Sequence, residues 1–162
     1  MIKLLKFPNE LKLKLGAQAT GKKDGMIDPK KIDEADAHIC KLCETSGVEI
    51  SKNLEELTAL WNSMKTMPES LERELSAQKI FTLAHEIKDI GSLCGYALIA
   101  YFGESLRDYI EQTALSLKNQ HIIIQAHVDA MNTAHKNGMR ENGGPAAEEL
   151  KRIVKIAIEK YH

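Results

Sequence analysis

The segment AHEIKDIGSLCGY, residues 84–96, has the periodicity of an amphipathic helix. At about 100° per residue, apolar side chains fall on one side of this helix: Ile80, Leu83, Ile87, Ile90 and Cys94. The opposite side carries the following residues: Gln78, Phe81, Thr82, His85, Lys88, Asp89 and Ser92. We therefore expect His85 to face away from the core of a helical protein, with Lys88 one turn further on.

An exposed imidazole beside an ammonium group is suited to carrying a phosphoryl group. The unprotonated ring nitrogen is the nucleophile, and an ordinary surface imidazole is in good part unprotonated at neutral pH. The ammonium group of Lys88 would offset the negative charge of the phosphate. The plainer alternative is that His85 and Lys88 belong to a solvated helix face with no chemical role.

Two glycines follow His85 on the same predicted helix, Gly91 and Gly95. Glycine in a helix costs about 1 kcal/mol relative to alanine, so its presence there calls for a reason. Small residues at these positions would lower the surface near His85 and let the backbone of a partner come close.

The pattern His85-x-x-Lys88 followed by Gly91 and Gly95 resembles the histidine-containing phosphotransfer (HPt) domains of multistep two-component phosphorelays. More narrowly, His85-Glu86-Ile87-Lys88 and Gly95-Tyr96 are similar to a small stand-alone HPt-like family of alphaproteobacteria. The similarity extends over most of the chain, in these segments: Pro8-Asn9, Leu11-Lys12, Asp28-Pro29, Ala126-His127-Val128-Asp129-Ala130 and Asn142-Gly143-Gly144. The resemblance implies an all-α fold, an antiparallel four-helix bundle of HPt type with an additional N-terminal helix and an extended N-terminal arm.

For function, the resemblance implies a phosphoryl carrier. His85 would be the phosphoacceptor, and Lys88 would stabilise the phosphate charge. Response-regulator receiver domains would be its partners, and a histidine kinase another. A receiver-contact surface would comprise Gln78, Phe81, Thr82, Asp89, Gly91, Ser92 and Gly95. Such a protein needs no cofactor and no metal of its own, since magnesium belongs to the receiver. The sequence of this chain also contains no nucleotide-binding glycine loop, so we expect no ATP-dependent kinase activity.

One residue departs from the family pattern. HPt domains usually carry glycine directly after the lysine, and this chain has Asp89. A carboxylate at that position would repel phosphate or alter the choice of partner. It keeps open a second hypothesis, a non-catalytic HPt-like module that binds and blocks a receiver or a kinase. A third class, an enzyme with its own active site, has little support, because carboxylate pairs such as Glu148-Glu149 are typical of solvated helix faces.

Composition narrows the remaining classes. With 22 basic and 23 acidic residues in 162, the net charge of −1 gives no reason to expect binding to nucleic acid or to an acidic membrane. The chain shows no signal-peptide segment or membrane-spanning run, so we expect a cytoplasmic protein, and a monomer. Cys40, Cys43 and Cys94 are an odd number and predict no disulfide framework. His38-x-Cys40-x-x-Cys43 resembles part of a metal site, but no fourth ligand is evident.

Along the chain we expect an N-terminal arm over residues 1–27, extended and partly disordered, and one helical domain over 28–162. Asp28-Pro29 predicts a helix start, Gly47 a helix stop or bend, and Asn142-Gly143-Gly144-Pro145 the start of the last helix. Together with the apolar periodicity of the segments between them, these signals predict six helices. The expected core positions include Ile32, Ala35, Ile39 and Leu42 on the first helix, Trp61 on the second, and Leu150, Ile153, Val154 and Ala157 on the last.

Overall fold

A computed structural model describes residues 29–68, 70–113 and 120–161, and within them the chain is all-α, with five helices and no strand. The helices are α2 (Pro29–Met64), α3 (Leu71–Leu93), α4 (Ala97–Gln112), α5 (Gln120–Lys136) and α6 (Pro145–Tyr161). The all-α prediction is confirmed. The expected N-terminal arm lies outside the described residues. No described helix combines the length and the apolar character that crossing a membrane requires.

The chain divides into two units between Lys41 and Leu42, within α2. In the first unit, the predicted helix start is confirmed, since Pro29 is the first helical residue. The apolar face predicted there is not buried: Ile32 is 46% exposed and Ala35 is also exposed. At the start of the second unit, Leu42 is 59% exposed. Helical spacing is present in this stretch, but spacing alone does not supply a surface to pack against.

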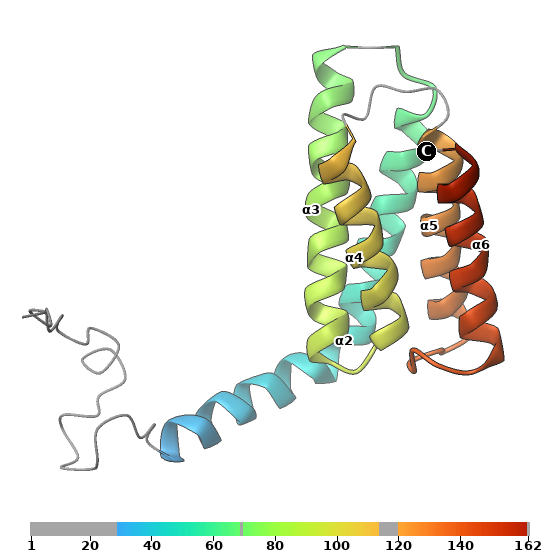
Figure 1. Cartoon of the computed structure of the whole chain (residues 1–162). Coiled ribbons are helices and arrows are strands. Elements are labelled where there is room, and N and C mark those ends of the chain that lie inside the picture. Colours follow the sequence, from blue (N-terminus) through green and yellow to red (C-terminus); the bar gives the residue numbers. More distant parts are fainter. Residues whose placement is uncertain (1–28, 69, 114–119, 162) are drawn as a thin grey trace, which may run out of the picture. The chain divides into compact units, whose positions relative to one another are not determined.

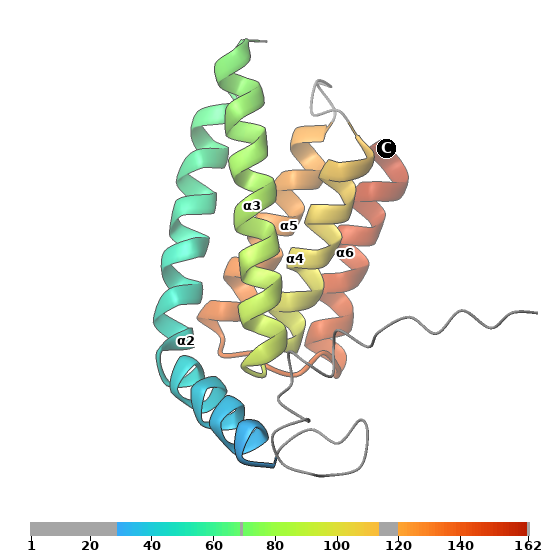
Figure 2. The same ribbon diagram turned by 90° about the vertical axis from the view of Figure 1, so that its left-hand side faces the viewer.

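In the second unit, helices that follow each other in sequence pack antiparallel (Figures 1 and 2). The side chains between them form one apolar core. Aliphatic residues dominate it. Trp61 of α2 is 2% exposed, which confirms its predicted core position, and its indole Nε1 donates a hydrogen bond to Oε1 of Gln125 on α5 at 2.8 Å. A second polar link between these helices runs from Asn132 Nδ2 to Thr58 Oγ1 at 3.0 Å.

Of the stop or bend predicted at Gly47, the stop is wrong, because α2 continues through this residue, and the described residues form five helices rather than six. Packing explains this glycine. A Cβ atom at position 47 would lie 3.0 Å from the hydroxyl oxygen of Tyr96. That hydroxyl also accepts a hydrogen bond from Arg140 at 3.0 Å, and the Arg140 guanidinium lies 4.3 Å from the centre of the Tyr96 ring. Gly47 thus makes room for a buried tyrosine and does not end the helix.

The prediction of no disulfide was also wrong, because Cys43 of α2 and Cys94 at the end of α3 form one. The two cysteines are 51 residues apart in sequence, and their Cα atoms are 5.1 Å apart. Only packing of α2 against α3 brings them together, so their spacing in the chain gave no indication of the bond. Cys40 is a free, exposed thiol.

The start of α6 follows the predicted turn chemistry, and the end of α3 also depends on a glycine with positive φ. The backbone N–H of Tyr96 donates to the carbonyl of Gly91 at 2.8 Å, and Gly95 between them has φ +79°, which is the glycine-dependent helix stop. Before α6, Gly144 has φ +92° and Pro145 is the first helical residue, as expected. One core position on α6 was wrong: Ile153 is 46% exposed, whereas Val154 and Ala157 are buried.

Candidate functional site

The α3 helix presents His85 as the sequence predicts. Ser70 caps the first turn of α3 by accepting a hydrogen bond from the N–H of Arg73. The inner face of α3 packs into the core through four buried residues: Ile80, Leu83, Ala84 and Ile87. The opposite face is exposed at these positions: Gln78, Thr82, His85, Asp89 and Ser92. Phe81 and Lys88 lie at its margin, half-buried. His85 therefore stands on a rigid, well-anchored helix with its side chain 48% exposed.

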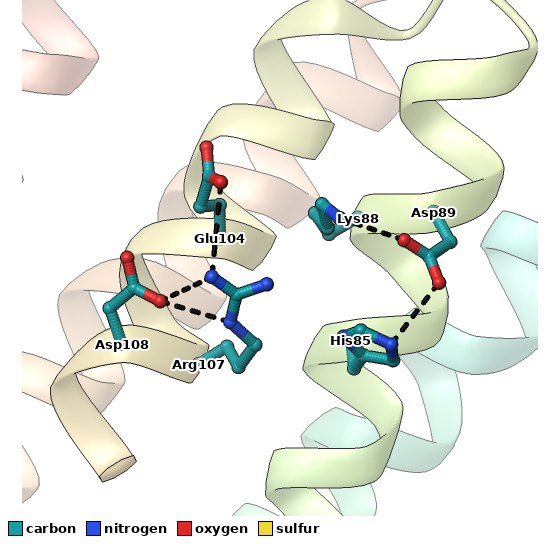
Figure 3. Close-up of polar contacts among 6 residues, drawn as sticks. All are labelled: His85, Lys88, Asp89, Glu104, Arg107 and Asp108. Atoms are coloured by element: carbon teal, nitrogen blue, oxygen red, sulfur yellow. Dashed lines mark hydrogen bonds and ion pairs between the residues drawn. The ribbon is translucent and has the colours of Figure 1, made fainter. Parts of the chain in front are cut away.

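Asp89 links the two residues expected to act in phosphate chemistry (Figure 3). Its Oδ2 atom lies 3.2 Å from Nε2 of His85, one turn before it on the helix. Its Oδ1 atom accepts a hydrogen bond from Nζ of Lys88 at 2.9 Å. The hydrogen bond from Lys88 is the main reason that the pKa of the Asp89 carboxyl lies below its ordinary value, and the charges of His85 and Lys88 add to the effect. At neutral pH, Asp89 is consequently an anion that engages both groups.

A neighbouring surface on α4 contributes charge to this site, and the sequence reasoning missed it. Arg107 lies across from the α3 residues in Figure 3, between Glu104 and Asp108. Its Nε atom donates to Oδ1 of Asp108 at 2.9 Å, and this hydrogen bond raises the pKa of the guanidinium above its ordinary value. Arg107 also contributes a small lowering of the Asp89 pKa across the two helices. The spacing of Glu104 and Arg107 is an ordinary helix ion pair, which gave no sign of a role beside α3.

A third glycine, Gly103, determines how closely α4 approaches the site helix. A Cβ atom on this buried residue would lie 2.9 Å from the carbonyl oxygen of Ala84 and 3.1 Å from the backbone nitrogen of Lys88. Those two residues flank His85 within one turn of α3. The sequence around Gly103 carries no signal of this contact, because the backbone that it meets belongs to another helix.

The two glycines that follow His85 have different roles in the structure. Gly91 is buried, and a Cβ atom there would lie 3.1 Å from both the backbone nitrogen and the Cβ of Ala100. Its small size therefore admits α4, and it is not available as the surface contact that we expected. Gly95 is exposed, and its positive φ shows that the turn between α3 and α4 requires it.

His127 of α5 is a core residue with no exposed surface, and both of its ring nitrogens form hydrogen bonds. Because a carbonyl can only accept, Nδ1–H of His127 donates to the Ile123 carbonyl at 2.8 Å. The other nitrogen, Nε2, then accepts from the hydroxyl of Ser105 at 2.9 Å. Burial lowers the pKa of His127 to about 4, against a smaller opposing effect of the bond to Ile123. The ring is neutral at pH 7 and joins α4 to α5.

Two clefts, of about 390 and 540 Å³, lie between α4 and α6, beside Tyr101 and Ser105. Neither cleft is lined by a residue of α3. Within the described ranges, no group of three or more His, Cys, Asp or Glu side chains lies together as a metal site would require. An exposed histidine that lines neither cleft suits contact with a macromolecule better than enclosure of a small substrate.

Comparison of the chain with models of protein families, with curated proteins and with solved structures found no match.

Proposed function

We propose that this protein is a histidine phosphotransfer protein of a two-component phosphorelay, with an antiparallel four-helix bundle of HPt type formed by α2 to α5. His85 accepts a phosphoryl group from a receiver-domain aspartate, or from a histidine kinase, and passes it to the aspartate of another receiver. The observation that carries the proposal is the placement of His85. It stands half-exposed on a capped, well-packed helix, with the ammonium of Lys88 one turn away.

Phosphotransfer to His85 requires three properties, and the described residues support each of them. The nucleophilic nitrogen must be reachable by a bulky partner, and His85 lies on the exposed face of α3 with its side chain 48% exposed. The transferred group must find positive charge, and Lys88 supplies it on the same face while Arg107 lies on the neighbouring helix. The acceptor must stay in position during docking, and the contact of Gly103 with Lys88 and Ala84 fixes the backbone on either side of His85.

The expected partner surface on this protein is formed by the exposed residues around His85: Gln78, Thr82, Asp89 and Ser92, with Phe81 at the edge. The protein would act as a monomer in the cytoplasm, without a cofactor, with magnesium held by the receiver. It would carry a phosphoryl group but would not consume ATP itself.

A second candidate function is a module that binds a receiver or a kinase and blocks it without taking up phosphate. The pairing of Asp89 with both His85 and Lys88 favours this candidate. The carboxylate neutralises the ammonium of Lys88, and its negative charge repels an approaching phosphate. The two functions differ in what His85 contributes. If the protein is a carrier, replacing His85 with alanine abolishes phosphotransfer. If the protein is a blocking module, the His85→Ala variant retains most of its inhibition of the receiver or kinase.

The test is phosphotransfer from a phosphorylated receiver domain to the wild-type protein and to His85→Ala. A carrier gains an acid-labile phosphate in the wild type only. Binding to the receiver without any gain of phosphate would contradict the carrier and favour the blocking module.

A further inference from the structure

We propose that Cys43 and Cys94 are a reversible redox pair, whose oxidation fastens the end of α3 to α2 and whose reduction releases it. The end of α3 carries Ser92, which belongs to the expected partner surface around His85. The pair thereby couples the redox state of the cell to docking at that surface. This coupling rests on the proposed function, whereas the redox chemistry of the two cysteines does not.

The disulfide lies where a reductant can reach it. Both cysteine side chains are half-buried, and their neighbours in the chain are all exposed: Leu42, Glu44, Leu93 and Gly95. A thiolate that opens a disulfide must approach one of its sulfur atoms, so exposure decides whether the bond can exchange. A bond in this position is open to exchange in the folded protein.

The packing around the pair keeps both cysteines in place when the bond is open. Tyr96, two residues after Cys94, is buried, and its hydroxyl lies directly beside Gly47, one turn after Cys43 on α2. Arg140 donates a hydrogen bond to the same hydroxyl at 3.0 Å. Two thiols that other contacts hold close together have a high effective concentration for each other, which favours closing the bond again.

The bond adds a covalent hold on the last turn of α3. Without it, the backbone N–H of Cys94 still donates to the carbonyl of Ile90 at 2.9 Å. The Cys43 thiol then has an acceptor within reach, because its Sγ atom lies 3.7 Å from the carbonyl oxygen of Leu93. A thiol is a weak donor, and an exposed helix end is the part of a helix that opens most readily. Reduction therefore loosens the turn that carries Ser92.

Reduction proceeds by thiol–disulfide exchange with a thiol such as glutathione. Its thiolate attacks one sulfur of the pair, and the electrons of the S–S bond go to the other sulfur, which leaves as a thiolate. A second glutathione thiolate attacks the mixed disulfide, so two glutathione thiols become one disulfide and the cysteines gain two electrons and two protons. Disulfides in the cytoplasm, where the proposed function places the protein, are usually transient in this way.

Hydrogen peroxide reverses the change. It oxidises one cysteine thiol to a sulfenic acid and is itself reduced to water. The second cysteine thiol then attacks the sulfenic sulfur, the disulfide forms, and another water leaves.

The redox chemistry can be measured on the protein alone. The wild type and Cys40→Ser are equilibrated in mixtures of reduced and oxidised glutathione, and free thiols are counted by alkylation and intact mass. We expect two thiols to appear and disappear together, reversibly, while the helical circular dichroism signal is retained. A bond that glutathione does not open in the folded protein, or that opens only as the protein unfolds, would overturn the proposal.

Amide hydrogen exchange measures the release of α3. The Cys94 amide should exchange about tenfold faster in the reduced protein than in the oxidised protein. The Thr113 amide is the matched control, since it donates to the Tyr109 carbonyl at the end of α4 and should not respond. Cys43→Ser/Cys94→Ser should match the reduced protein in every glutathione mixture. Equal exchange of the Cys94 amide in the two forms would contradict the release.

Phosphotransfer from a phosphorylated receiver, measured on both forms, tests the coupling. We expect the oxidised protein to take up phosphate about fivefold faster, at the lower end of the usual coupling between two sites. Equal rates would overturn the coupling and leave the carrier function standing. Absence of transfer in both forms would overturn the carrier function and the coupling together, and the glutathione and exchange measurements would still decide whether the cysteines are a redox pair.

Discussion

Gly103 of α4 packs directly against the backbone of Lys88 on α3: a Cβ atom on Gly103 would lie 3.1 Å from the Lys88 nitrogen and 3.2 Å from its Cβ. The same atom would lie 2.9 Å from the carbonyl of Ala84. The close approach of α4 to α3 at the candidate site is therefore possible because position 103 has no side chain.

We expect Gly103→Ala to lower the free energy of unfolding by about 1–3 kcal/mol, because α4 must shift away from α3 to admit the methyl group. Urea unfolding at pH 7 measures the change. Gly143→Ala is the matched control, since a Cβ atom there meets nothing within 4 Å and its φ is not positive. Equal stability of the two variants would mean that the α3–α4 contact is looser than described.

Lys88→Gln should slow phosphotransfer to His85 by about 10- to 150-fold, since a charge-assisted hydrogen bond to phosphate contributes roughly 1.5–3 kcal/mol. The measurement is the rate of phosphate uptake from a phosphorylated receiver. Lys79→Gln removes an exposed ammonium from the same helix and should leave the rate unchanged. Identical rates for both variants would remove Lys88 from the mechanism.

The Cys43–Cys94 disulfide should contribute about 2–4 kcal/mol to stability, because it limits the conformations of the unfolded chain over a separation of 51 residues. Unfolding in the presence and absence of a reductant measures this contribution. The double variant Cys43→Ser/Cys94→Ser should match the reduced protein, and Cys40→Ser should retain the full effect of the reductant. Insensitivity of the wild type to reductant would contradict the bond.

The buried His127 predicts a specific loss of stability in acid. Its pKa is about 4 in the folded protein and about 6.5 in the unfolded chain, so below pH 6.5 the unfolded chain binds more protons. This contribution is fully present above pH 6.5 and is lost as the pH falls toward 4, by about 3 kcal/mol in total.

Replacing this histidine tests that prediction. Between pH 6.5 and 4, His127→Gln should lose less stability than the wild type, although it starts lower because it lacks the imidazole contacts with Ser105 and Ile123. Parallel curves for the wild type and His127→Gln would show that His127 does not titrate in this window.

The features predicted correctly from the sequence are those that local spacing and turn chemistry determine. The apolar side of α3 is buried and its His85 side is exposed because the 3.6-residue repeat assigns each position to one face. The starts of α2 and α6 follow from Pro29 and Pro145, whose fixed φ suits the first turn of a helix.

The features that the sequence did not reveal depend on contacts between segments far apart in the chain. Gly47 carries the local signal of a helix stop, but its neighbour in space is Tyr96, and the helix continues. The Cys43–Cys94 bond and the contact of Gly103 with Lys88 likewise require the helices to be packed first. Ile153 fits the apolar repeat of α6, yet that repeat is wider than the surface available to bury it.

The central claim is that His85 carries a phosphoryl group, and the most direct measurement is the intact mass of the protein after incubation with phosphorylated receiver domains. His85→Ala is a fair comparison, because a 48%-exposed side chain outside the core should change stability by no more than about 0.5 kcal/mol. We predict one acid-labile phosphate on the wild type and none on folded His85→Ala. A phosphate on both proteins, or on neither despite receiver binding, would contradict the account.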